Sequence, residues 1–288
     1  MIEIQDLLHT QGKFTLSIPR LVIRPGITVI VGSNGAGKST LLRLLATVMA
    51  PQKGTITYLG KTTEQALPLI RTYTGYVPTG IELYEDMTPL RFLNYMAELK
   101  GVRSQENIDC WLNRFGLEGK GRKIKQLSQG QQQKLTIAQA LLGDPLFLYL
   151  DEVLTYLDSL EKNNVIQEIS RSAKQRWVLV STHEMNDWAL EADAVLWLHQ
   201  GRIAFYGSLL EWTSDLAWKV WSGRIERKDL ALIPKAQLMS HQVQGDEVLI
   251  RMIGPEAPLA QLKPLTPTLE DAYFIRKLTR NPATVTYP

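Results

Sequence analysis

A glycine-rich segment near the start of the chain has the residue types and spacing of a phosphate-binding loop. Its glycines allow the backbone to curl so that successive N–H groups point inward at phosphate oxygens. We expect Lys38 to reach the β- and γ-phosphates of a nucleoside triphosphate, and the hydroxyl of Ser39 to bind Mg²⁺. The predicted nucleotide-binding residues are Gly32, Ser33, Asn34, Gly35, Ala36, Gly37, Lys38, Ser39 and Thr40.

The segments on either side of this loop have the patterns that such a loop requires. Residues 27–31 form an apolar, β-branched run typical of a buried strand, and a leucine-rich helical pattern begins at Leu41. A helix that follows the loop directly adds its positive N-terminal end to the site. This context disfavours the alternative, a loop whose glycines merely make it flexible.

Two adjacent carboxylates follow a second apolar run, at residues 146–150. Ending a buried strand with Asp151 and Glu152 is costly unless a cation or a reaction needs the charges. Asp151 is therefore a candidate Mg²⁺ ligand, and Glu152 is a candidate general base that orients and deprotonates an attacking water. The alternative for Asp151 is a helix cap.

A short polar segment, Ser128-Gln129-Gly130-Gln131, would by itself indicate only a turn. Together with the preceding motifs it resembles the signature of the ABC ATPases, Leu-Ser-Gly-Gly-Gln, with Gln129 in place of the first glycine. The resemblance implies a head-to-tail dimer in which this segment completes the ATP site of a second subunit. Ser128 and the Gly130 amide would then contact the γ-phosphate, because a hydroxyl, an amide and a helix N-terminus all suit an anion. Gln129 is expected to point away from the nucleotide.

Two later segments resemble further motifs of this family, in the family's order. Asp158 lies in a segment similar to the D-loop, which crosses the dimer interface, although Tyr156 stands where a glycine is usual. His183 follows a strand pattern at 177–180 and resembles the switch histidine. The resemblance implies that His183 contacts the γ-phosphate and holds the attacking water with Glu152.

Other positions depart from the family pattern. Thr79 stands where the Q-loop glutamine is usual, and its shorter side chain reaches Mg²⁺ less easily. The residue that stacks on adenine falls at or near Gln11, so His9 or Phe14 is the candidate, although Phe14 suits a core strand equally well. Five residues are expected either to line the groove that receives a helix of a membrane subunit or to pack within the helical subdomain: Tyr84, Met87, Phe92, Tyr95 and Met96.

The overall composition is that of an ordinary globular protein. The chain has 288 residues, 44% of them hydrophobic and 21% charged, and a net charge of +3. So mild a charge disfavours nucleic acid as the main partner. The single cysteine, Cys110, cannot form an internal disulfide and fits a reducing compartment. With neither a signal-peptide pattern nor an apolar stretch of the roughly 18–20 residues that cross a bilayer, we expect a cytoplasmic protein.

Alternating strand and helix patterns predict an α/β fold built on a parallel sheet. The family resemblance covers residues 2–210 and implies a P-loop ABC cassette: a mixed sheet core with antiparallel N-terminal strands, and a helical subdomain at about 80–143. Residues 1–210 are the predicted ATPase domain, and 211–288 a small α+β accessory domain. In the latter, residues 247–253 predict a strand, and the spacing of Thr268 and Asp271 predicts the capping box of a terminal helix.

Residues 267–273 resemble the closing segment of ATPase subunits from bacterial exporters of the ABC-2 and antibiotic-resistance type. The resemblance implies an ATPase that uses ATP and Mg²⁺, pairs with a second ATPase subunit, most simply as a homodimer, and drives a separate membrane permease. The protein would then be held at the inner face of the cell membrane through that permease. One alternative is a soluble ABC ATPase that acts on a ribosome or a nucleic-acid machine, and another is a non-hydrolysing regulatory cassette. No residue pattern identifies a transported substrate.

Overall fold

The computed structural model describes residues 1–80, 83–102, 105–117, 121–171 and 173–279. Within them the chain divides into two units: Met1–His183 with Leu190–Tyr206, and Glu184–Ala189 with the residues from Gly207 onward. The sequence placed a single boundary near Leu210. It did not predict that Glu184–Ala189 belongs with the second unit. The end of the expected accessory domain, residues 280–288, lies outside the described residues.

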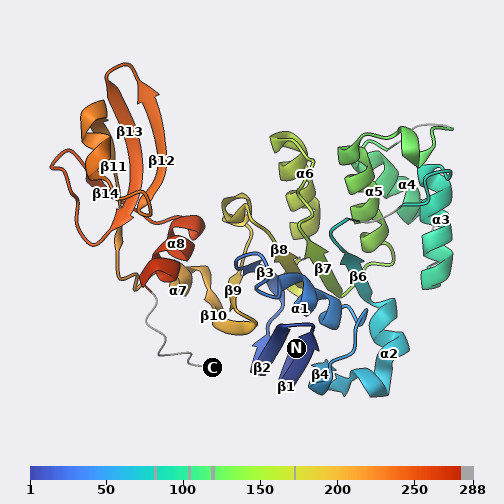
Figure 1. The fold of residues 1–288 in the computed structure, drawn as a ribbon. Helices are drawn as coiled ribbons and strands as arrows, with labels where there is room; N and C mark the ends of the chain where they lie inside the picture. Colours follow the sequence, from blue (N-terminus) through green and yellow to red (C-terminus); the bar gives the residue numbers. More distant parts are fainter. Residues whose placement is uncertain (81–82, 103–104, 118–120, 172, 280–288) are drawn as a thin grey trace. The chain divides into compact units, whose positions relative to one another are not determined.

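A six-stranded sheet forms the centre of the first unit, in the order β10-β9-β3-β8-β7-β6 (Figure 1). The strands are β3 (Gly26–Val31), β6 (Thr74–Val77), β7 (Phe147–Asp151), β8 (Trp177–Ser181), β9 (Ala194–His199) and β10 (Arg202–Ser208). All pairings from β9 to β6 are parallel, as predicted. Every residue of β3, β7 and β8 is buried, which explains the continuous apolar runs of these strands.

A second, antiparallel sheet contains the N-terminal strands, in the order β2-β1-β4-β5. Its strands are β1 (Ile2–Gln11), β2 (Phe14–Ile23), β4 (Lys53–Tyr58) and β5 (Lys61–Thr62). Helix α1 (Lys38–Leu45) buries four leucines in a core that it shares with side chains of both sheets. The hydroxyl of Tyr58 donates a hydrogen bond of 2.5 Å to the carbonyl of Leu45, the last residue of α1. The helix that follows the phosphate loop is therefore fixed by packing on two sides.

The remaining helices of the first unit include a cluster of α3, α4 and α5, which contact one another (Figure 1). The helices are α2 (Thr63–Thr72), α3 (Pro89–Lys100), α4 (Gln105–Arg114), η1 (Ile124–Gln126), α5 (Gln129–Leu141), α6 (Ser159–Ser170) and η2 (Ala173–Gln175). Gly101 ends α3 with a φ of +72°, a conformation that favours glycine. The cluster lies within residues 80–143, where the sequence predicts a helical subdomain.

The second unit is built on a four-stranded antiparallel sheet, in the order β12-β13-β11-β14. Its elements are η3 (Met185–Trp188), α7 (Leu209–Thr213), β11 (Lys219–Glu226), η4 (Arg227–Leu232), β12 (Leu238–Gln244), β13 (Glu247–Gly254), β14 (Lys263–Leu265) and α8 (Leu269–Thr279). Ile225, Val248, Ile250 and Met252 share one buried cluster. The predicted strand at 247–253 and the predicted terminal helix are both confirmed.

Candidate functional site

Four of the segments singled out in the sequence follow neighbouring parallel strands, β3, β8, β7 and β6. The phosphate loop follows β3, His183 follows β8, Glu152 follows β7 and Thr79 follows β6. Because the carboxyl ends of parallel strands meet at one edge of a sheet, these segments gather there, where ligands of open α/β sheets bind.

The phosphate loop has the conformation that its glycines allow. Gly35 and Gly37 have φ values of +75° and +106°, which are unfavourable for any residue with a Cβ atom. Lys38 is the first residue of α1 and is only 7% exposed, and its Nζ donates a hydrogen bond of 2.8 Å to the carbonyl of Gly32. The lysine side chain therefore folds back over its own loop.

The aromatic ring of Phe14 lies beneath this loop. A Cβ atom at Gly37 would come within 2.7 Å of Cζ of Phe14. Phe14 also packs against the core shared by α1 and the two sheets, whereas His9 is 8% exposed and Gln11 is exposed. The packing favours a supporting role for Phe14, and the residue that stacks on adenine stays a prediction.

The charges of the two carboxylates predicted to carry the chemistry act on Lys38. Burial lowers the pKa of Lys38, and the negative charges of Glu152 and Asp151 oppose that shift. Helix α1 also contacts β7, which ends at Asp151. The sequence-predicted loop and the sequence-predicted carboxylates are thus parts of one site.

Asp151 is 1% exposed and ends a strand, so the alternative of a helix cap is wrong. The hydroxyl of Ser181, on the neighbouring strand β8, donates a hydrogen bond of 2.5 Å to Oδ1 of Asp151. The other oxygen, Oδ2, is buried and has no hydrogen-bond partner among the described residues. A buried carboxylate oxygen without a donor is costly, so this atom is suited to a cation.

Glu152 has a φ of +54°, a strained conformation for a residue with a side chain. Its N–H donates to the carbonyl of Ser181 at 3.1 Å and to Oγ of Ser181 at 3.2 Å. Its carboxylate accepts a hydrogen bond of 3.3 Å from the N–H of His183, and Nε2 of His183 lies 3.3 Å from Oε1. Glu152 and His183 are therefore held side by side.

Thr79 lies near this group but contacts it only weakly. Its hydroxyl is 3.5 Å from the backbone carbonyl of Asp151, at the limit of a hydrogen bond. The shorter side chain thus reaches the backbone behind the carboxylate.

The signature segment forms the start of α5. Ser128 is its N-cap: its hydroxyl accepts a hydrogen bond of 3.2 Å from the N–H of Gln131, whose side chain accepts one of 3.1 Å from the N–H of Ser128. Gln129 is exposed. A Cβ atom at Gly130 would come within 2.9 Å of the carbonyl of Tyr156, so glycine is needed where the signature meets the D-loop of the same chain.

The residues of the segment that resembles the D-loop make contacts within the subunit itself. Tyr156 is 63% exposed and has a φ of +69°, a conformation that favours glycine. Asp158 is the N-cap of α6 and accepts a hydrogen bond of 2.8 Å from the N–H of Glu161. Glu161 in turn forms an ion pair of 2.7 Å with Lys134 of α5. The D-loop and the signature helix are therefore joined within the chain.

The five expected groove residues differ in burial. Phe92 is 4% exposed and packs in the core, while Tyr84 and Tyr95 are exposed and their ring centroids lie 5.7 Å apart. Met87 and Met96 are half-buried.

Sequence reasoning missed the part played by Ser181. This hydroxyl connects the ends of β7 and β8, but it lies 30 residues from Asp151 along the chain. The only local signal was a small hydroxyl residue at the end of an apolar strand pattern.

The fold and the site define a P-loop nucleoside triphosphatase. The ABC transporter family model matches residues 20–155. The chain is 34% identical over 197 residues to the ABC transporter ATP-binding protein NatA of Bacillus subtilis. The matched region covers 66% of this chain and 80% of NatA. It is 26% identical over 275 residues to the probable multidrug ABC transporter ATP-binding protein YbhF of Escherichia coli, which covers 86% of this chain and 46% of that protein.

Among solved structures, the dimeric structure of a bacterial ABC transporter cassette is similar with a TM-score of 0.64 and 25% identity, which covers 73% of this chain and 99% of the cassette. The chain therefore belongs to the family of ABC transporter ATP-binding proteins. It is an ATP-binding and ATP-hydrolysing subunit, and the predicted cassette fold is confirmed. None of the helices in the described part of the chain is long and apolar enough to span a membrane.

Proposed function

We propose that this chain pairs with a second ATPase subunit, most simply another copy of itself, and drives export through a separate integral membrane permease at the inner face of the membrane. The supporting observation is the cluster of Asp151, Glu152 and His183 beside Lys38. The exporter assignment is supported by the similarity to YbhF, which extends over 275 residues, and by the resemblance at residues 267–273.

Asp151 and Ser39 would hold Mg²⁺. Mg²⁺ commonly binds one or two protein oxygens together with substrate phosphates. The buried, unpartnered Oδ2 of Asp151 and the hydroxyl of the half-buried Ser39 fit this pattern. The ion would supply charge neutralisation between the phosphates.

Glu152 and His183 would position and deprotonate the attacking water. The carboxylate of Glu152 takes the proton, while His183 contacts the γ-phosphate from the neighbouring strand end. Lys38 leaves the Gly32 carbonyl for the β- and γ-phosphates, which replace its present acceptor with stronger, charged ones. The backbone N–H groups from Gly32 to Thr40 and the N-terminus of α1 bind the remaining phosphate oxygens.

The signature would complete the site of the second subunit in trans. Ser128 and the Gly130 N–H lie at the start of α5, a helix of 13 residues, and both suit the γ-phosphate. Asp158 crosses to the partner from the start of α6. ATP then acts as the link between subunits, and its hydrolysis releases them.

The substitution Glu152→Gln tests this assignment. It keeps the shape of the side chain and removes the base, so we expect ATP turnover to fall by about 10²–10⁴-fold. ATP binding persists, and a dimer accumulates in size-exclusion chromatography with ATP and Mg²⁺. The matched control is Glu256→Gln, an exposed residue of the second unit, which should behave as the unsubstituted protein does. Unimpaired turnover of Glu152→Gln would remove Glu152 from the mechanism.

The transporter assignment has its own test. The full chain, purified from membranes under mild detergent, should bring with it a hydrophobic protein of several spans. Recovery with ribosomes or nucleic acid instead would support the alternative of a soluble machine.

A further inference from the structure

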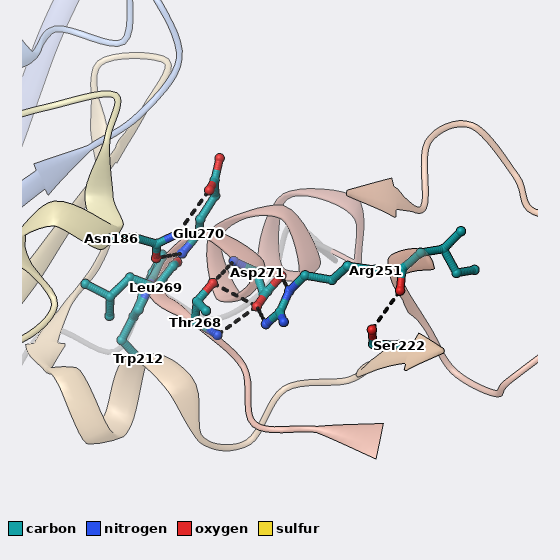
Figure 2. Close-up of polar contacts among 9 residues, drawn as sticks. Asn186, Trp212, Ser222, Arg251, Thr268, Leu269, Glu270 and Asp271 are labelled. Atoms are coloured by element: carbon teal, nitrogen blue, oxygen red, sulfur yellow. Dashed lines mark hydrogen bonds and ion pairs between the residues drawn. The ribbon is translucent and has the colours of Figure 1, made fainter. Parts of the chain in front are cut away.

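The segment that follows His183 is held by the second unit. Element η3 begins two residues after His183, and it buries Met185 and Trp188, which are 6% and 0% exposed. It contacts α8, and Figure 2 shows the side chain of Asn186 directed at the first turn of that helix. Both elements belong to the same unit.

Two hydrogen bonds connect Asn186 with Glu270. The side-chain amide of Asn186 donates to Oε2 of Glu270 at 3.1 Å, and Oδ1 of Asn186 accepts from the N–H of Glu270 at 3.4 Å. The second bond satisfies one of the N–H groups that the first turn of every helix leaves without a partner. Asn186 thus caps α8 from a position 84 residues earlier in the chain.

The same helical turn is also bonded to the accessory sheet. Thr268 and Asp271 form the capping box, with Thr268 Oγ1 accepting from the N–H of Asp271 at 3.2 Å. Asp271 is 2% exposed and accepts two hydrogen bonds from the guanidinium of Arg251 on β13 (Figure 2). The first turn of α8 therefore connects β13 to η3 through charged and neutral hydrogen bonds.

A displacement of α8 must move the chain next to His183. Only Glu184 and Met185 lie between His183 and Asn186, and an extended chain spans only about 3.3–3.6 Å per residue. With Asn186 hydrogen-bonded to α8 and Trp188 buried, this short connection limits how far the backbone at His183 can move away from the segment that follows it. The residue that needs a defined place beside Glu152 is therefore tethered to the second unit.

We infer that Asn186 and Glu270 are positioning residues for ATP hydrolysis, through which the accessory unit sets the place of His183. The inference rests on the proposed role of His183 beside Glu152. The hydrogen-bonded pair then affects the rate of ATP hydrolysis through the position of His183. The accessory unit then controls hydrolysis through a defined pair of side chains.

The hydrogen-bonded pair of Asn186 and Glu270 can be broken by one substitution and restored by exchanging the amide and the carboxylate between the two positions. Asn186→Asp sets a carboxylate against Glu270, whose pKa is already raised by burial and by Asp271. Both hydrogen bonds can form again in Asn186→Asp with Glu270→Gln, because the glutamine amide then donates to the aspartate. Asn163→Asp adds the same charge at an exposed position of α6 and is the matched control.

The test is steady-state ATP hydrolysis by the full-length protein, with circular dichroism to verify folding. Asn186→Asp should lower kcat about fivefold or more and leave the KM for ATP nearly unchanged. The doubly substituted protein should recover most of the loss, and the control should lose nothing. If Asn186→Asp does not fold, Glu270→Ala, which removes the carboxylate without repulsion, is expected to lower kcat in the same way.

The proposed role of His183 is separated from this inference by His183→Ala. That substitution should abolish most turnover, and adding Asn186→Asp to it should cause no further loss. Normal turnover in His183→Ala would refute the role of the histidine itself. If His183→Ala is inactive while Asn186→Asp retains full kcat, or if the rebuilt pair gives no recovery, the positioning role of Asn186 and Glu270 is wrong.

Discussion

Ser181→Ala is the substitution that most directly probes how the carboxylates are held. The hydroxyl of Ser181 donates to Oδ1 of Asp151 at 2.5 Å, and its oxygen lies 3.2 Å from the N–H of Glu152. Alanine leaves Glu152 its second acceptor, the Ser181 carbonyl at 3.1 Å. It leaves Asp151, which is 1% exposed, with no side-chain donor from β8.

The magnitude follows from the type of bond that is lost. A hydrogen bond to a charged group contributes about 1.5–3 kcal/mol, so we expect the nucleotide-free protein to lose about this much stability. Groups that orient a metal ligand commonly change metal affinity or activity by about 10–100-fold when they are removed. We therefore expect the Mg²⁺ concentration for half-maximal ATPase activity to rise by about that factor, with partial recovery at high Mg²⁺.

The assay is ATP hydrolysis across a Mg²⁺ titration, together with thermal unfolding without nucleotide. The control is Ser222→Ala, which deletes a hydroxyl that donates to the carbonyl of Ile250 at 2.7 Å in the accessory sheet (Figure 2). It should cost about 1 kcal/mol or less and leave the Mg²⁺ dependence unchanged. An unaltered Mg²⁺ dependence in Ser181→Ala would show that Ser181 does not orient Asp151 for a metal ion.

Three further predictions concern packing and protonation. Burial lowers the pKa of Lys100 to about 8, so the unfolded chain binds the proton more tightly than the folded chain does. The free energy of unfolding of the first unit should therefore rise between about pH 8 and pH 10. Lys100→Met should remove this rise and stabilise the protein by about 1–3 kcal/mol at pH 7, as measured by denaturant titration. In Gly130→Ala the new Cβ atom would meet the Tyr156 carbonyl at 2.9 Å, so the free energy of unfolding should fall by about 1–3 kcal/mol and ATP-dependent dimerisation should weaken. Gln129→Ala, at an exposed position, should change neither property. Tyr156→Gly should be more stable than Tyr156→Ala by about 1 kcal/mol, because only glycine accepts a φ of +69° without strain; equal unfolding midpoints for the two variants would contradict this.

The sequence predicted those features that depend on local pattern. The phosphate loop, the apolar strands that precede it and Asp151, and the capping box at Thr268 each lie within a few consecutive residues. Fixed spacing determines such features, because backbone conformation and side-chain direction follow from neighbours in the chain.

Features that depend on contacts between distant segments were missed. Ser181 meets Asp151 across two strands, and Asn186 meets Glu270 across 84 residues. Hydrophobic periodicity carries no signal for such pairs, because each partner alone is an ordinary polar residue near the end of an element. For the same reason the sequence assigned 184–189 to the ATPase domain, while their packing places them with the second unit.

In this ATPase the residues predicted for hydrolysis and the phosphate loop are held by different contacts. Glu152 combines a φ of +54° with hydrogen bonds from two directions, since its N–H binds Ser181 and its carboxylate binds the N–H of His183. A strained backbone persists only where its surroundings fix it, so the geometry at Glu152 depends on where the chain around His183 is held. That chain continues within three residues into the contact of Asn186 with α8. Conditions that loosen α8 should therefore slow hydrolysis before they weaken ATP binding, because the phosphate loop is fixed separately by the core around α1.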